Sequence, residues 1–106
     1  MQFINRIELV GIVGSIRKRN VSGRIAVSLS VATEYCFTDR NGSPIIETTW
    51  HSVSAFDGPG IPDLEKLEKG SKVRVSGRIR TSRITTPSSE QMVITEVLAK
   101  SITLIK

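Results

Sequence analysis

Apolar and polar residues alternate along five stretches of the chain, a pattern typical of strands covered on one side. In "RIAVSLSVATEYCF", which begins at Arg24, the apolar set is Ile25, Val27, Leu29 and Val31. In "SKVRVSGRIRTSRI", which begins at Ser71, one face holds Val73, Val75, Gly77 and Ile79. "MVITEVLAKSITLI" closes the chain, and we expect a break or bulge within Glu96–Lys100. These patterns predict an all-β protein.

The first of the five stretches, "RIELVGIVGSI", is apolar on both faces. One face holds Ile7, Leu9 and Val13, and the other holds Val10 and Ile12. Such a strand is covered on both sides, by the core and by another subunit. We therefore place Ile7 and Leu9 in a subunit contact. Gly11 and Gly14 permit a bulge or a sharp bend.

The connections between these stretches complete the fold prediction. "RKRNVSG" is expected to be a basic loop, and Asn41-Gly42 predicts a hairpin before a third strand that starts near Ile45. "DLEKLEKG" predicts a short helix of about two turns, with Pro62 in its first turn and Gly70 at its C-terminal cap. Five strands with one short helix between the third and fourth is the element order of the OB-fold, a Greek-key barrel. Another five-stranded barrel is the alternative.

Length and composition set the class of protein. The chain has 106 residues, which we read as one domain, and its 39% hydrophobic content fits a globular protein. It contains no apolar run of the roughly 18 residues that a membrane helix needs. Its first residues lack the pattern of a signal peptide, and Cys36 has no cysteine to pair with. We therefore expect a cytoplasmic protein.

Positive charge is concentrated in two stretches. The formal net charge is +5, which favours an acidic partner, nucleic acid first and a membrane surface second. Residues 70–83 contain Lys72, Arg74, Arg78, Arg80 and Arg83 without an acid, and residues 16–24 contain Arg17, Lys18, Arg19 and Arg24, again without one. A solvated, aggregation-resistant edge is the simpler explanation of the first row. Because its cations repel one another, we predict that both sets contact phosphates.

The large side chains of "TTWHSVSAF" fall on its polar face. Trp50 and Phe56 share that face with Thr48, Ser52 and Ser54, while Val53 and Ala55 lie on the other. Burial in a subunit interface, or in the core after a shift of parity, would explain both rings. The functional hypothesis is a platform on which bases stack, worth roughly 1–3 kcal/mol per base. Phe37, and less directly Tyr35, could extend it.

Residues for catalysis or metal binding are scarce. One His and one Cys exclude the usual zinc sites. His51 faces the side of Val53 and Ala55, where a packed, hydrogen-bonded histidine is expected rather than a catalytic base. The glycines form no phosphate-binding loop. We predict neither an enzyme nor a bound cofactor or metal.

The order of these segments resembles that of the bacterial single-stranded DNA-binding proteins over residues 5–105. The segments that carry the resemblance are "NRIELVGIVG", "SVAT", "TTWHSVSAF", "LEKGSKVRVSGRIRTSR" and "TEVLAKSITLI". The resemblance implies an OB-fold barrel, assembled as a homotetramer or from dimers, around which single strands wrap. It implies base stacking by Trp50, Phe56 and Phe37, and a subunit contact at His51.

Two features depart from that family. Ile84 stands where an aromatic residue is usual, which implies a weakened stacking site. The sequence ends at Lys106 without the acidic tip that recruits replication and repair proteins in the family, so the resemblance does not extend to that role.

The sequence hypothesis is a non-enzymatic, sequence-tolerant single-stranded DNA-binding protein of replication, recombination and repair, associated with the bacterial nucleoid. One alternative is a small tailless dimer of the primosome, similar to primosomal replication protein N. Another is a protein-interaction module whose rings meet a polypeptide and whose basic row only solubilises it. Stacking and phosphate contacts do not read the 2′-hydroxyl, so these features fit RNA as well as DNA.

Overall fold

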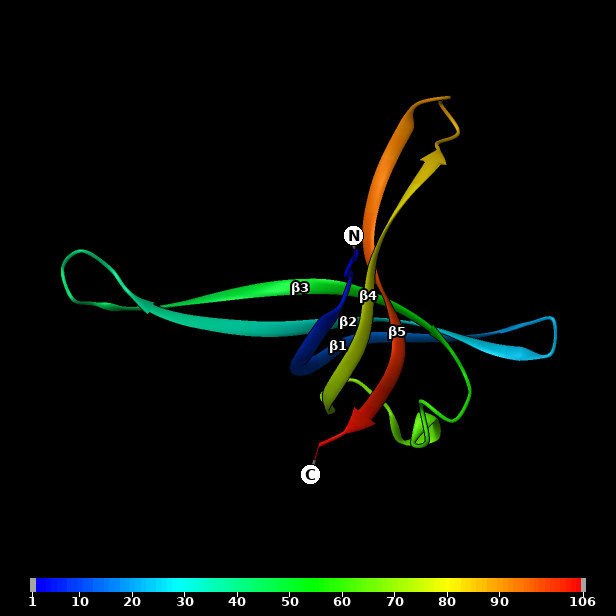
Figure 1. Ribbon diagram of the computed structural model, residues 1–106, viewed down its shortest axis with the longest axis horizontal. Coiled ribbons are helices and arrows are strands. Elements are labelled where there is room, and N and C mark those ends of the chain that lie inside the picture. Colours follow the sequence, from blue (N-terminus) through cyan, green and yellow to red (C-terminus); the bar gives the residue numbers. More distant parts are fainter. Residues whose placement is uncertain (1, 106) are drawn as a thin grey trace.

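The computed structural model describes residues 2–105, which form five strands and one 3₁₀ turn (Figure 1). The elements in chain order are β1 (Ile7–Val21), β2 (Arg24–Thr38), β3 (Pro44–Phe56), η1 (Leu64–Lys66), β4 (Lys72–Thr85) and β5 (Gln91–Leu104). Within this described range, helical structure of the length and apolarity required to cross a bilayer does not occur.

The strands close into a barrel in the order β1-β2-β3-β5-β4. Neighbouring strands are antiparallel except for β3 and β5, which meet in parallel at Val53–Val97 and Ser54–Leu98. A closed five-stranded barrel with a short helical turn between the third and fourth strands is the OB-fold. The expected fold is confirmed.

The core consists of the side chains that face inward at alternate positions along the strands. β2 contributes Val27, Leu29 and Val31, and the other strands supply Leu9, Val13, Val53, Ala55, Val73, Val75, Val97 and Ile102. Ile61 and Leu67, from the connection between β3 and β4, join the same cluster. The alternation read from the sequence is therefore the inside–outside pattern of the barrel.

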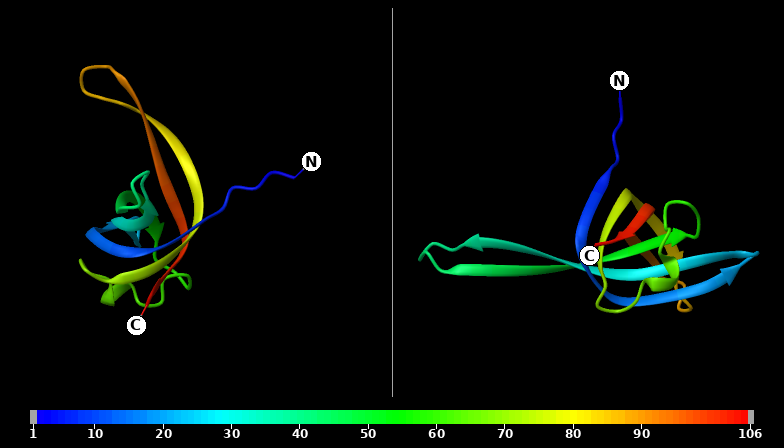
Figure 2. Two further views of the ribbon diagram at one scale, coloured as in Figure 1. Left: turned by 90° about the vertical axis from the view of Figure 1, so that its left-hand side faces the viewer. Right: turned by 90° about the horizontal axis from the view of Figure 1, so that it is seen from below.

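Three hairpins project beyond the barrel as twisted arms, formed by β1–β2, β2–β3 and β4–β5 (Figures 1 and 2). The radius of gyration is 16.1 Å, compared with about 13 Å for a compact domain of this length. Because the arms extend past the core, apolar side chains on them stay in contact with solvent. Ile46 on one arm and Val93 on another are 63% and 62% exposed.

Two of the expected local structures were wrong. Arg17–Arg19 lie within β1 rather than in a loop, because β1 and β2 stay paired as far as the Val21–Arg24 pair. The expected two-turn helix is the single 3₁₀ turn η1, since the Asp63 side chain forms no capping hydrogen bond and Leu67 is already extended. Alternation of apolar residues could not reveal the end of β1, which is polar.

The expected irregularities and the hairpin are confirmed. β1 has a bulge at Gly14, between the pairs Val13–Val31 and Ser15–Ser30. β5 has one at Lys100, which the register between β4 and β5 skips. Gly42 lies at φ 81° in the turn that joins β2 and β3, a conformation that favours glycine.

The placement of Leu9 in a subunit contact was wrong. Leu9 is only 8% exposed and belongs to the core of its own chain, with Ile7 packed beside it. The exposed apolar side chains of this part of β1 are Val10 and Ile12, which lie on the opposite face. The sequence correctly separated Leu9 from Val10 and Ile12 as opposite faces of the strand. The prediction assigned the wrong one of these two faces to the subunit contact.

Candidate nucleic-acid interface

Trp50 and Phe56 lie on the outer face of the barrel and are 61% and 50% exposed. The register between β2 and β3 runs without a shift from Thr38–Pro44 to Ala26–Phe56, so the two rings keep the same parity along β3. Burial of these rings in the core of this chain after a shift of parity, the second alternative considered above, is thereby excluded. Six residue steps separate them, which corresponds to roughly 20 Å along a strand.

Small side chains cover the sheet between the two rings. On β3 these are Ser52 and Ser54, and opposite them on β2 are Ser30 and Ser28, with Ala26 and Ala32 facing the rings themselves. The Ser15 and Ser30 hydroxyls are 2.8 Å apart, which ties β1 to this surface. The result is a low floor bounded by a ring at either end.

Arg17 and Arg19 of β1 border this floor. Arg17 lies opposite Ser28, and Arg19 lies opposite Ala26, which in turn pairs with Phe56. A groove of about 410 Å³ follows the floor, with Arg17 on one side and Glu96 and Ile94 of β5 on the other. The strand that replaced the expected basic loop therefore places two cations beside the rings.

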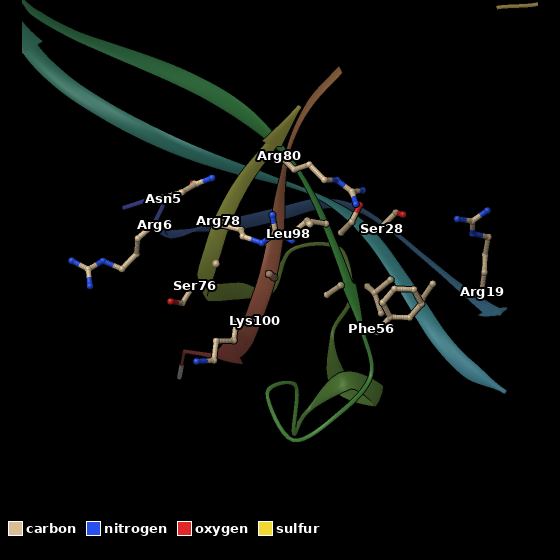
Figure 3. A pocket seen from close by; sticks show the side chains of 16 residues that line it. Asn5, Arg6, Arg19, Ser28, Phe56, Ser76, Arg78, Arg80, Leu98 and Lys100 are labelled. Carbon is tan, nitrogen blue, oxygen red and sulfur yellow. The ribbon is translucent and has the colours of Figure 1, made fainter. Parts of the chain in front are cut away.

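A second, larger groove of about 800 Å³ begins at Phe56. Figure 3 shows Arg78 and Arg80 reaching toward it from β4 and Arg19 standing on the opposite side, with Phe56 between them. Arg6 and Lys100 also line it. Sequence reasoning missed these two residues, because Arg6 precedes the first strand and Lys100 is the bulge residue of β5.

Arg24 was predicted to contact phosphate, but its guanidinium covers the Phe56 ring. Its Cζ lies 4.8 Å from the ring centroid, and its Nη2 donates to the Asp57 carbonyl at 3.3 Å. The Asp57 carboxylate, held by the backbone N–H of Ile25, lies 3.9 Å from Arg24 Nε. Arg24 is therefore part of the aromatic surface, since a guanidinium plane stacks on rings.

The cations of β4 do not form one continuous row. Lys72, Arg74, Arg78 and Arg80 share a parity, but only Arg78 and Arg80 line the large groove. Residues 70–83 contain no acid, but two of these cations meet acids of other strands: Glu8 of β1 accepts from Arg74 at 2.8 Å, and Glu96 of β5 pairs with Arg80. Both acids come from neighbouring strands, so the local sequence could not reveal them.

Glu96 is an acid that lines the groove over the floor. One carboxylate oxygen accepts from Arg80, including Nε at 3.2 Å, and the other accepts from the Ser54 hydroxyl at 2.9 Å. The Arg80 hydrogen bond lowers the pKa of Glu96, partial burial opposes this, and the Ser54 bond adds to the lowering. The groove therefore contains a carboxylate that stays ionised at neutral pH.

Two further cations predicted to contact phosphate lie elsewhere. Lys18 has inward parity, and its ammonium donates to the carbonyls of Leu64 and Leu67 at 2.9 and 3.4 Å, which holds η1 against β1. Arg83 lies on the β4–β5 arm opposite Val93, and its side chain is on the face of β4 opposite that of Arg78 and Arg80. Neither borders the floor.

Tyr35 and Phe37 do not extend the platform of Trp50. The unshifted register pairs Tyr35 with Glu47 and Phe37 with Ile45, so both rings point to the face of the β2–β3 arm opposite Trp50. They are 67% and 38% exposed, with ring centroids 6.0 Å apart. The prediction of a shared platform was wrong. Which side chains of β2 share a face with Trp50 depends on the register between β2 and β3, which the sequence of one strand does not contain.

His51 lies on the inward parity of β3 and is partly buried, as expected. Its Nε2 is 2.8 Å from the Thr33 hydroxyl, so the imidazole has a hydrogen-bond partner within the chain. Across residues 2–105, no three residues of the His, Cys, Asp and Glu types come together as a metal site would require.

This chain is an OB-fold with exposed rings on the outer face of β3 and with cations of β1 and β4 beside that face. These features place it in the class of oligonucleotide-binding barrels, since OB-folds commonly bind oligonucleotides on the face of β2 and β3. Within that class, residues 4–105 match the family described as the single-strand binding protein family. The chain belongs to this family.

Named relatives agree with the assignment. The chain is 32% identical over 98 residues to the single-stranded DNA-binding protein of Xylella fastidiosa strain Temecula1, and it covers 60% of that protein. It is 33% identical over 104 residues to single-stranded DNA-binding protein 1 of Xylella fastidiosa strain 9a5c, and it covers 76%. A mitochondrial single-stranded DNA-binding protein of Drosophila melanogaster is 31% identical over 102 residues, and the chain covers 69% of that protein. These alignments take in 91%, 94% and 93% of this chain.

Solved structures share the fold. The SSB of Plasmodium falciparum, in complex with ssDNA, matches with a TM-score of 0.84 at 24% identity, over 100% of this chain and 98% of that one. A deletion mutant of the single-stranded DNA binding protein from Thermus aquaticus matches with a TM-score of 0.81 at 22% identity, over 97% and 51%. At these identities the likeness concerns the fold.

Proposed function

We propose that this protein binds single-stranded DNA without reading its sequence and without catalysing a reaction. The observation that carries the proposal is the exposure of Trp50 and Phe56 on one outer face, joined by a floor of small residues. Every base has a π-face, so rings on an open sheet bind any sequence. Membership of the single-strand binding protein family supports the same function.

Phosphates would be neutralised by the cations that border the two grooves. These are Arg17 beside the floor, and Arg6, Arg19, Arg78, Arg80 and Lys100 around the large groove. Each neutralised phosphate releases condensed counterions, so the logarithm of affinity falls by about 0.7 per contact for each tenfold rise in salt. Lys72, Arg74 and Arg83 lie outside both grooves and are not included in this set.

The proposal is tested by the fluorescence of Trp50, the single tryptophan of the chain. Titration with oligothymidine at low salt should quench its emission, because a stacked base lies against the indole. Added salt should reverse the quenching. Unchanged emission at saturating oligomer would contradict the proposal, and a matching titration with oligouridine would show whether RNA is also a ligand.

Replacing Trp50 by Ala should weaken binding of oligothymidine by about 1–3 kcal/mol, the range for one stacked base. Fluorescence anisotropy of a labelled oligomer measures this in the absence of the tryptophan. Phe3→Ala is the matched control, since Phe3 is an aromatic residue 89% exposed in the segment before β1. Equal affinities of Trp50→Ala and the unchanged protein would remove Trp50 from the site.

We further propose that the protein self-associates as a homotetramer or a homodimer and acts at the bacterial nucleoid in replication, recombination and repair. Val10 and Ile12, exposed by 41% and 43% on β1, support an apolar contact between copies. The bacterial relatives are named single-stranded DNA-binding proteins, and the proposed role in these processes would use that activity.

A further inference from the structure

Gly14 occupies the bulge of β1 and is the residue left without a partner in β2. Bulges often mark a place where a side chain has to be re-aimed. Trp50 lies two strands away, on β3, opposite Ala32 of β2. The positions of its ring atoms connect the bulge to the candidate interface.

The indole of Trp50 crosses β2 and ends over Gly14. A Cβ added at Gly14 would lie 2.6 Å from Cη2 of the indole and closer still to Cζ3, and 3.1 Å from the Ser30 hydroxyl. No real Cβ tolerates such a separation, so any side chain at residue 14 would displace the ring or the strand. The far edge of the ring therefore lies in a space that exists only because residue 14 is glycine.

Backbone conformation does not explain this glycine. Among the described residues, the glycines with positive φ are Gly23, Gly42 and Gly70, and all three lie in turns or loops. Alanine is therefore compatible with the backbone at residue 14. What glycine provides here is room for the indole.

The indole is 61% exposed although its far edge reaches β1. A ring in this position rests on the sheet with one side against β1 and β2 and the other side open. Binding to a ring that is already held in place loses less conformational freedom than binding to a mobile one.

We propose that Gly14 is a positioning residue, which seats the indole of Trp50 against β1 so that one open face is presented to a base. This inference rests on the proposed function for its link to DNA, but the position of the ring is independent of DNA.

The first test uses Gly14→Ala without DNA. The methyl group should lift the indole away from β1, which should shift the emission of Trp50 to longer wavelength and increase its quenching by acrylamide. Gly58→Ala is the matched control, because a Cβ at Gly58 meets nothing within 4 Å and its φ is not positive. Emission of Gly14→Ala identical to that of the unchanged protein would overturn the proposal.

The second test is a double-mutant cycle with oligothymidine. Gly14→Ala should weaken binding about tenfold when Trp50 is present. In the Trp50→Ala background the same change should have no effect, because the ring it displaces is gone. An equal loss in both backgrounds would overturn a role that acts through Trp50.

Failure of Gly14→Ala to fold would also be informative. The double variant Gly14→Ala, Trp50→Ala should then fold, since the colliding ring is removed, and its failure to fold would overturn the proposal. If the unchanged protein does not bind oligothymidine, the proposed function fails, while the emission comparison still decides the role of Gly14.

Discussion

At the scale of single residues, we expect Glu96 to weaken binding at the candidate interface, because its carboxylate accepts hydrogen bonds from Arg80 and Ser54. Without Glu96, both groups would be free to donate to a phosphate. A strand that contacts Arg80 must compete with an ionised acid already bonded to it. The chain thus carries an anion of its own within the candidate groove.

Glu96→Gln should strengthen binding of oligothymidine and make it more dependent on salt. The amide releases Arg80 for one more phosphate contact, so the slope of log affinity against log salt should steepen by about 0.7. Glu90→Gln, on the loop between β4 and β5, removes the same charge outside both grooves and controls for net charge. Identical slopes for the two variants would show that Glu96 does not restrain Arg80.

The same carboxylate should make stability depend on pH. Because the folded-state pKa of Glu96 is lowered, its ionised form stabilises the fold above the unfolded-state pKa, and this contribution is lost as the pH falls through the folded-state pKa. Urea unfolding should therefore show Glu96→Gln to be less stable at neutral pH. The difference should shrink in acid, and a difference independent of pH would contradict the assigned bond.

At the scale of secondary structure, the twist of β4 places cations of the same strand in different surroundings. Along β4, Lys72 and Arg78 share a parity, but Lys72 pairs with Ile12 of β1 while Arg78 lies in the groove with Phe56. A twisted strand in a closed barrel turns its outer side chains toward different surroundings as it proceeds. Cations that form one row in the sequence thus serve two surfaces.

Arg78→Gln and Lys72→Gln form a matched pair that tests this division. Each removes one positive charge from the same face of β4. Arg78→Gln should weaken binding and reduce the magnitude of the salt slope by about 0.7, whereas Lys72→Gln should leave the slope unchanged. Equal effects of the two would indicate that binding responds to net charge alone.

At the scale of the whole molecule, the arms leave surface that the chain itself does not cover. The β2–β3 arm presents Trp50 on one face and Tyr35 and Phe37 on the other, so its two sides carry separate aromatic groups. The outer side of β1 adds Val10 and Ile12. A barrel with a larger core would bury more of this area, and self-association is the other way to bury it.

Val10→Glu should lower the mass measured by multi-angle light scattering if β1 forms the contact between copies. A charge placed in an apolar interface without a partner is strongly unfavourable. Val21→Glu is the control, because Val21 is equally exposed, at 42%, but lies at the tip of the β1–β2 arm. An unchanged mass for Val10→Glu would exclude this part of β1 from the interface.

The sequence alone determined which side chains of a strand share a face. The alternation at Val27, Leu29 and Val31 was enough to predict buried positions, and the parity of Trp50 and Phe56 was enough to set both rings apart from that core. These are local properties, because successive side chains of an extended backbone point in opposite directions. The bulges followed from glycine and from the interrupted alternation near Lys100.

Only the tertiary structure decided which of these faces meet. The pairing of Arg80 with Glu96, the approach of Trp50 to Gly14 and the convergence of Arg19 with Arg78 all join residues of different strands. Closure, register and twist of the barrel bring them together, and none of these is encoded in the alternation within a single strand. Local backbone geometry therefore sorts residues into inner and outer faces, whereas barrel closure selects the neighbours that make an outer face a site.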